Sequence, residues 1–334
     1  MNKIIYLLKY DHSKNIWDVI QSLSSKKILE NLWYKVNFID QNKLHKPIWK
    51  KIKLFLNGFF CFDDNDFSNT FPFHSDIIPI FSNIHLELDY WKQEKLEKYF
   101  FNKKNIEYLK KYEPIWCRDQ ATSDILNKYN IKAINNSCIT LLFNKRTKNE
   151  AQNATELILV DVDEYIPIPK EYKNNYTYIT QYINNWDRYL NKTKLQIAED
   201  LLNYYKKNAK LVITSRFHCA IPCIAMWIPV ILLWENNKRL KQNFVDIYPY
   251  IHFWKRHKTL FRKLNFSKNI PILNINIKYW FNILDVIYSV LYKVILNILY
   301  KFNIIKVNWD IKEKNIENFK KEQINNIIKI LKWI

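Results

Sequence analysis

Residues 210–223, KLVITSRFHCAIPC, hold an apolar run, a short polar turn and the start of a helix. Residues 211–214 are typical of a buried strand, and residues 219–226 of a helix. A strand that enters a helix through a tight turn is the repeating unit of parallel α/β sheets. The turn contains Arg216 and His218, so a guanidinium, an imidazole and the first N–H groups of a helix are expected to meet there. That combination suits a carboxylate or a phosphate, although Arg216 capping a neighbouring carbonyl would fit the same residues.

The same alternation of apolar runs and helical patterns extends in both directions. Strands are expected at residues 4–8, 36–39, 52–56, 77–84, 114–117, 131–134, 139–143, 157–160, 177–180 and 230–233, and helices at 18–32, 93–111, 120–129 and 192–207. The polar stretch 144–155 lacks periodicity and is the expected link between two such series. The sequence therefore predicts an α/β protein with two Rossmann-like doubly wound domains, residues 1–146 and 147–275, facing each other across a cleft.

Residues 276–334 follow a different pattern and predict a basic, amphipathic helical tail. Its apolar part, residues 279–305, is interrupted by Asp285 and Lys293, so it is not expected to span a membrane. Its Lys and aromatic flanks suit peripheral contact with an anionic membrane surface. A helix packed back on the protein fits the same pattern, and both alternatives stay open. Residues 310–334 predict one more Lys-rich helix.

The composition is that of a globular protein that binds an anion. Of 334 residues, 48% are hydrophobic and 25% are charged, which argues against a disordered chain. The 52 Lys and Arg outnumber the 32 Asp and Glu and give a net charge of +20, which favours a phosphorylated substrate, a nucleic acid or an acidic membrane. Because Lys is spread along the chain and no nucleic-acid-binding motif occurs, a nucleic-acid partner is not expected.

Five scattered cysteines and the lack of a signal-like start predict a reduced, cytoplasmic protein, with a peripheral place at the inner face of the plasma membrane if the tail binds lipid. His218, Cys219 and Cys223 offer no fourth ligand, so no metal site is expected.

Glycine is almost absent, with one Gly against twelve Trp. A chain of this length holds roughly 23 Gly on average. Phosphate loops of the GxGxxG or Walker type are therefore excluded. An anion site in this chain has to rely on side chains.

Two further turns carry residues of the same chemistry. Residues 114–120 predict a strand that ends in Arg118 and a helix capped by Asp119. Residues 79–85 end in His85. Taken singly, an Arg beside a capping Asp and a lone His are more often structural than functional.

Together these motifs resemble the polysaccharide pyruvyl transferase family, in that family's order, from about residue 12 to about residue 240. The most specific resemblance is Arg216-Phe217-His218 followed by Pro229-Val230-Ile231, which is similar to the family's Arg-Leu-His and Pro-Val-Ile block. The other similar segments are residues 15–23, 56–60, 79–85, 116–122 and 137–141. The resemblance does not extend beyond residue 245.

The resemblance implies a GT-B-like fold and transfer of a pyruvyl group from phosphoenolpyruvate onto two hydroxyls of a sugar, which forms a ketal. It implies phosphoenolpyruvate as the donor substrate, a sugar or glycan acceptor that is free or lipid-linked, and no cofactor. By position in the motifs, His85 and His218 are the expected catalytic residues, with His85 as the acid that protonates the donor's methylene carbon. The expected substrate-binding residues are Arg216, Arg118, Asp18, Asn15 and Asn57.

Several tryptophans stand where glycine is expected. Trp17, Trp116 and Trp227 occupy glycine positions of the family pattern, and Trp33 and Trp234 lie where glycine is natural at a helix or strand end. Repeated exchange of the smallest side chain for the largest is sterically improbable. A code in which UGA specifies Gly, translated as though UGA specified Trp, would explain it, so UGA codons are expected for Trp17, Trp116, Trp227 and Trp234. The alternative is a divergent, non-catalytic family member that binds a membrane or a nucleic acid.

Overall fold

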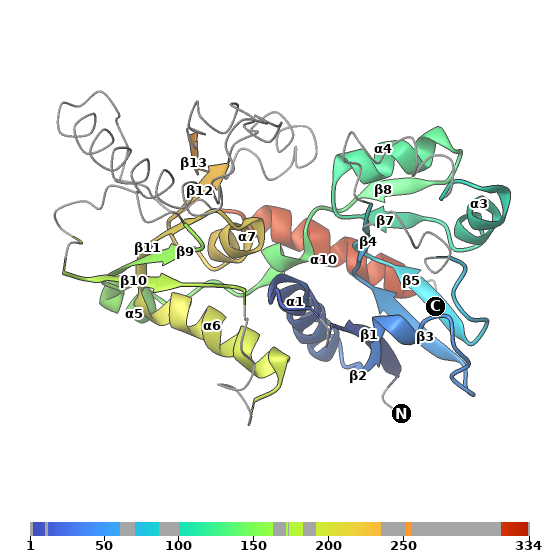
Figure 1. Ribbon diagram of the computed structural model, residues 1–334, viewed down its shortest axis with the longest axis horizontal. Coiled ribbons are helices and arrows are strands. Elements are labelled where there is room, and N and C mark those ends of the chain that lie inside the picture. Colours follow the sequence, from blue (N-terminus) through green and yellow to red (C-terminus); the bar gives the residue numbers. More distant parts are fainter. Residues whose placement is uncertain are drawn as a thin grey trace, which may run out of the picture.

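The computed structural model describes residues 3–10, 13–60, 71–86, 100–162, 172, 174–182, 192–234, 252–255 and 315–332. These residues form an α/β protein with two parallel, Rossmann-like sheets and a C-terminal helix (Figure 1). The prediction of an α/β protein with two Rossmann-like sheets is therefore confirmed. The domain boundaries near residues 146 and 275 stay predictions.

The first sheet has the strand order β2-β1-β3-β5, and all its strands are parallel. Apolar residues of the central strands are buried on both faces, as parallel sheets require. The elements of this part are β1 (Ile4–Lys9), α1 (Trp17–Asn31), β2 (Lys35–Asp40), η1 (Gln41–Lys43), β3 (Ile52–Leu56) and β5 (Ile77–Phe81).

Two short strand pairs continue the first half. They are β4 (Phe59–Phe60) with β6 (His85–Leu86), and β7 (Ile115–Cys117) with β8 (Ala133–Asn135), accompanied by α3 (Lys103–Lys110) and α4 (Gln120–Lys128). The single strand expected at residues 77–84 is wrong in its extent. The strand ends at Phe81, because the N–H groups of Ser82 and Asn83 both donate to the carbonyl of Leu56. His85 therefore starts a separate strand. Of the helix expected at 93–111, residues 93–99 lie outside the described part.

The strand expected at residues 139–143 is also wrong. The segment forms a 3-10 helix, η2 (Ile139–Leu142). Its first residue is held by side chains, because Asn83 accepts the N–H of Ile139 at 3.1 Å and Ser24 donates to its carbonyl at 2.7 Å. Such long-range contacts override the local strand pattern.

The second sheet has the order β10-β9-β11-β12-β13 and is also parallel. Its elements are α5 (Lys148–Asn153), β9 (Glu156–Val160), β10 (Tyr176–Ile179), α6 (Lys194–Asn208), β11 (Ala209–Thr214), α7 (Phe217–Ala225), β12 (Val230–Trp234) and β13 (His252–Lys255). The stretch 144–155, expected to be an irregular link, contains α5. A capping box between Thr147 and Glu150 starts this helix.

The C-terminal helix α10 (Glu317–Lys332) packs across both halves (Figure 1). The Nζ of Lys320, a buried residue, donates to the carbonyls of Phe143 at 3.0 Å and Ala225 at 2.6 Å. Further along the helix, Ile327 and Leu331 share a hydrophobic cluster with the first sheet. For residues 317–332, packing on the protein is therefore confirmed, while residues 279–305 lie outside the described part. No helix among the described residues is long and apolar enough to cross a bilayer.

Three helices, α1, α4 and α7, end in the same backbone motif. In each, a residue with positive φ follows the helix, and the next N–H bonds back to the carbonyl five residues earlier, as in a Schellman motif. The residues with positive φ are Trp33 at 65°, Asn130 at 55° and Trp227 at 61°. Gly-type backbone at Trp33 and Trp227 is thus confirmed. Trp17 and Trp116 lie in a helix and a strand with ordinary backbone.

Replacing Lys320 with Met should destabilise the protein, because the buried carbonyls of Phe143 and Ala225 lose their donor. We expect a loss of about 1–3 kcal/mol in the free energy of unfolding, measured by denaturant titration. Lys321→Met, an exposed change on the same helix, is the control and should have little effect. Equal stability of the two variants would contradict a structural role for Lys320.

Candidate active site

Polar side chains meet where the two halves face each other, and Arg118 connects them. Arg118 follows β7 and is buried, with 3% of its surface exposed. Its Nη1 lies 3.1 Å from Oε1 of Gln21 on α1 and 3.4 Å from Nε2 of His218 on α7. One guanidinium therefore contacts a helix from each half.

His218 presents a buried donor beside this guanidinium. Burial, then the charges of Arg118 and His85, lower the pKa of His218 well below its usual value, so the ring is neutral near pH 7. Arginine has no acceptor, so Nε2 of His218 accepts and Nδ1 carries the proton. Nδ1 is buried and has no hydrogen-bond partner among the residues that the structure describes. An unsatisfied N–H in the first turn of α7 suits an anionic oxygen.

His85 forms a close pair with Asp119. Nδ1 of His85 lies 2.5 Å from Oδ2 of Asp119, and both residues are buried. Asp119 also caps α4, where its Oδ1 accepts the N–H of Thr122 at 2.9 Å. Burial alone would raise the pKa of Asp119, but His85, Arg118 and the Thr122 N–H lower it on balance. His85 therefore faces an ionised carboxylate.

Asp18 is a second buried carboxyl beside Arg118. Burial raises its pKa from 3.8 to about 6, against the opposing effects of Trp17, Arg118 and Ser13. Its Oδ1 has no hydrogen-bond partner in the described part of the chain. A carboxyl with a pKa near 6 exchanges its proton close to neutral pH, which is the property of a general acid or base.

Asn57 lies at the end of β3 and is fully buried. Its backbone carbonyl accepts the hydroxyl of Tyr10 at 2.9 Å, but neither atom of its side-chain amide has a partner among the described residues. Buried polar atoms without partners are rare in native proteins. Asn57 shares this property with Asp18 and His218.

Arg216 pairs with Asp161, and Asn15 contacts Trp17 and Tyr182. Nε of Arg216 donates to Oδ2 of Asp161 at 2.8 Å, at the end of β9. Oδ1 of Asn15 accepts the N–H of Trp17 at 3.2 Å, and the backbone of Asn15 bridges to Tyr182. The structure thus brings His85, His218, Arg118 and Asp18 together by distance or mutual charge effects, and pairs Arg216 with Asp161.

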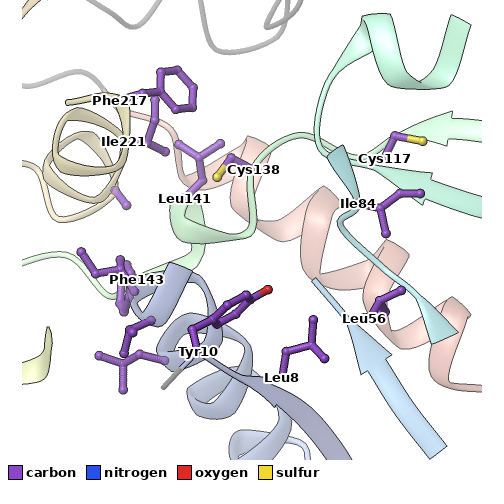
Figure 2. Packing of buried hydrophobic residues seen from close by; sticks show 14 of the residues in the cluster. Leu8, Tyr10, Leu56, Ile84, Cys117, Cys138, Leu141, Phe143, Phe217 and Ile221 are labelled. Atoms are coloured by element: carbon purple, nitrogen blue, oxygen red, sulfur yellow. The ribbon is translucent and has the colours of Figure 1, made fainter. Parts of the chain in front are cut away.

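Residues from both halves share one buried apolar cluster (Figure 2). Tyr10 and Leu8 come from the first half, Phe217 and Ile221 from α7, and Leu141 from η2 between them. Charges in such surroundings interact more strongly than in water. Among the described residues, no cluster of His, Cys, Asp and Glu is arranged to hold a metal ion.

The sequence patterns predict no role for Gln21 and only a helix-capping role for Asp119. The signal for Asp119 was present, because Arg118-Asp119 precedes a helix, but its pairing with His85 joins residues 34 positions apart. Trp17 is a further neighbour of His218. The two rings lie edge-on, with 5.1 Å between their centroids.

Asp18→Asn should stabilise the protein above pH 6. Because the native carboxyl binds its proton more tightly than the unfolded one, wild-type stability falls as the pH rises from about 4 to about 6. The difference between 3.8 and about 6 corresponds to roughly 3 kcal/mol. Thermal unfolding at a series of pH values should show the variant gaining stability over wild type across this range. The exposed Asp200→Asn serves as control, and an identical gain there would exclude Asp18 as the cause.

Comparisons with known proteins find one similar solved structure and one matching family, which are described in turn. A solved structure of a functionally uncharacterised protein from Klebsiella pneumoniae subsp. pneumoniae NTUH-K2044 is similar over 76% of this chain and 93% of that chain, with 12% identity and a TM-score of 0.43. No curated protein matches the chain. Residues 98–237, which include Arg118, Asp119 and His218, match the family described as Polysaccharide pyruvyl transferase, and the chain therefore carries a domain of that family.

Proposed function

We propose that the protein transfers a pyruvyl group from phosphoenolpyruvate onto two hydroxyls of a sugar in a cell-surface polysaccharide or its lipid-linked precursor. The observation that carries this proposal is the Arg118–His218 pair. It combines a buried guanidinium with a buried N–H donor that has no partner. Phosphoenolpyruvate brings a phosphate and a carboxylate, and such groups pair well with arginine and with N–H donors.

The reaction takes one proton from each of the two sugar hydroxyls, delivers one proton to the methylene carbon of the donor, and releases the other with phosphate as hydrogen phosphate. Protonation of the methylene carbon of the donor gives a cationic carbon, to which the first sugar hydroxyl adds. Departure of phosphate and addition of the second hydroxyl complete the ketal. His85 is the proposed acid, and Asp18, with a pKa of about 6, is the proposed acceptor of a hydroxyl proton.

A cleft between the halves, as in a GT-B-like enzyme, is proposed to bind the donor on one side and the acceptor on the other. Arg216, on the second half beside Asp161, is proposed to contact the second anionic group of the donor once that group reaches the cleft. Asn15 and Asn57 are proposed to bind hydroxyls, because amides both donate and accept hydrogen bonds.

His218→Ala and Arg118→Lys should abolish most transfer while the fold persists. Loss of one such contact is expected to slow turnover on the order of 10²–10³-fold. Phosphate release from phosphoenolpyruvate with a panel of sugars measures turnover, and calorimetry measures donor binding. His74→Ala, at a partly exposed site near Asp76, is the control. Wild-type rates in both site variants would refute the assignment, whereas donor binding by the wild type without turnover would favour a non-catalytic family member.

A further inference from the structure

Asp119 is bonded through both carboxylate oxygens, to two different partners. Oδ1 accepts the N–H of Thr122 and caps α4, while Oδ2 lies 2.5 Å from Nδ1 of His85. The carboxylate has no exposed surface. Burying a charge is costly unless it is matched by a partner.

Capping alone does not explain this aspartate. In the same protein, α3 is capped by Asn102, α5 by Thr147 and α6 by Thr193, all neutral side chains. A neutral cap stabilises a helix start about as well as aspartate does. A buried negative charge at α4 therefore indicates a second task, and the atom it faces is Nδ1 of His85.

We propose that Asp119 is a positioning residue that holds His85 with Nδ1 toward α4, so that His85 exchanges protons with the substrate through Nε2. This inference deepens the proposed function and rests on it for the identity of the substrate. The carboxylate keeps Nδ1 protonated, because Nδ1 donates to it. This fixes the orientation of the ring and leaves Nε2 as the atom that gains or loses a proton. Among the described residues, Arg118 and His218 are further charged or titratable groups of this site, and the hydroxyl of Thr122, 3.5 Å from Nδ1 of His85, donates to Asp119.

Asp119→Asn tests this inference, because asparagine keeps the cap but turns an NH₂ group or a neutral oxygen toward His85. Nitrogen-15 NMR of labelled histidine should show a changed tautomer for His85, with the tautomer of His74 unaltered as an internal control. Turnover should fall by roughly 10²–10⁴-fold, with donor affinity nearly unchanged. Thr193→Ser, a conservative change at the cap of α6, controls for general effects of altering a cap.

The two readouts separate the two proposals. If the His85 tautomer is the same in Asp119→Asn as in the wild type, the positioning role is wrong, whatever the activity. If it changes but the wild type never transfers pyruvate, the positioning role stands and the proposed reaction falls.

A separate observation concerns tryptophans whose backbone is in the left-handed region, with positive φ. Six residues other than glycine have positive φ in the described part of the chain, and three are Trp33, Trp49 and Trp227. Trp33 and Trp49 are 86% and 90% exposed, so no packing of the indole holds the backbone in this strained region. The equivalent position after α4 is Asn130, a residue that tolerates left-handed backbone.

We infer that glycine is the natural residue at positions 33, 49 and 227. A Cβ atom makes left-handed backbone unfavourable, and glycine alone avoids that cost. Glycines at these positions would also relieve the near absence of glycine in a chain that has twelve Trp.

Two variants at position 33 isolate the backbone effect. Both Trp33→Gly and Trp33→Ala remove the exposed indole, but only the first removes Cβ. Trp33→Gly should therefore raise the folding equilibrium constant about 5- to 30-fold over Trp33→Ala, measured by denaturant titration. Equal stability of the two variants would refute the backbone argument.

The gene and the native protein decide the identity of these residues. UGA codons at positions 33, 49 and 227, and glycine in peptides sequenced from the native protein by mass spectrometry, are the expected results. UGG codons at all three positions would overturn the inference.

Discussion

The two halves of the molecule share one buried guanidinium. Arg118 belongs to the first half, yet its Nη1 reaches both Gln21 on α1 and His218 on α7. A cation in an apolar region has to be balanced by nearby charge. Asp119, ionised beside it, and Asp18, half-ionised near pH 6, supply that balance. Arg118, which precedes α4, therefore links α4 to α1 through Gln21 and to α7 through His218.

With one glycine in the sequence, a phosphate site in this protein cannot use a glycine-rich loop. Rossmann-like proteins often bind phosphates on backbone N–H groups of glycine-rich loops. Here the loops that leave β7 and β11 carry Arg118 and Arg216 instead. Side chains on rigid strand ends then supply the positive charge. Because buried side chains are fixed by their neighbours, this site is sensitive to changes in the residues behind it, such as Gln21 and Asp119.

The sequence predicted most strands and helices because apolar runs of parallel sheets are buried on both faces and read clearly. It failed where distant side chains decide the backbone. Asn83 and Ser24 convert residues 139–142 from a predicted strand into η2. The same limit applies to the site. His85, Arg118 and His218 were found from local motifs, whereas the Asp119–His85 pair and the contact between Gln21 and Arg118 depend on tertiary packing that no local pattern encodes.

The position of α10 in the chain has a consequence for biosynthesis. Ile327, Ile330 and Leu331 complete a hydrophobic cluster with Ile5, Leu7 and Phe55 of the first sheet. A ribosome makes β1 and β3 well before α10, so this apolar face of the first sheet is not covered by α10 while the second half is synthesised. Exposed apolar surface on incomplete chains promotes aggregation. The first sheet therefore carries an aggregation-prone surface during synthesis until α10 has been made.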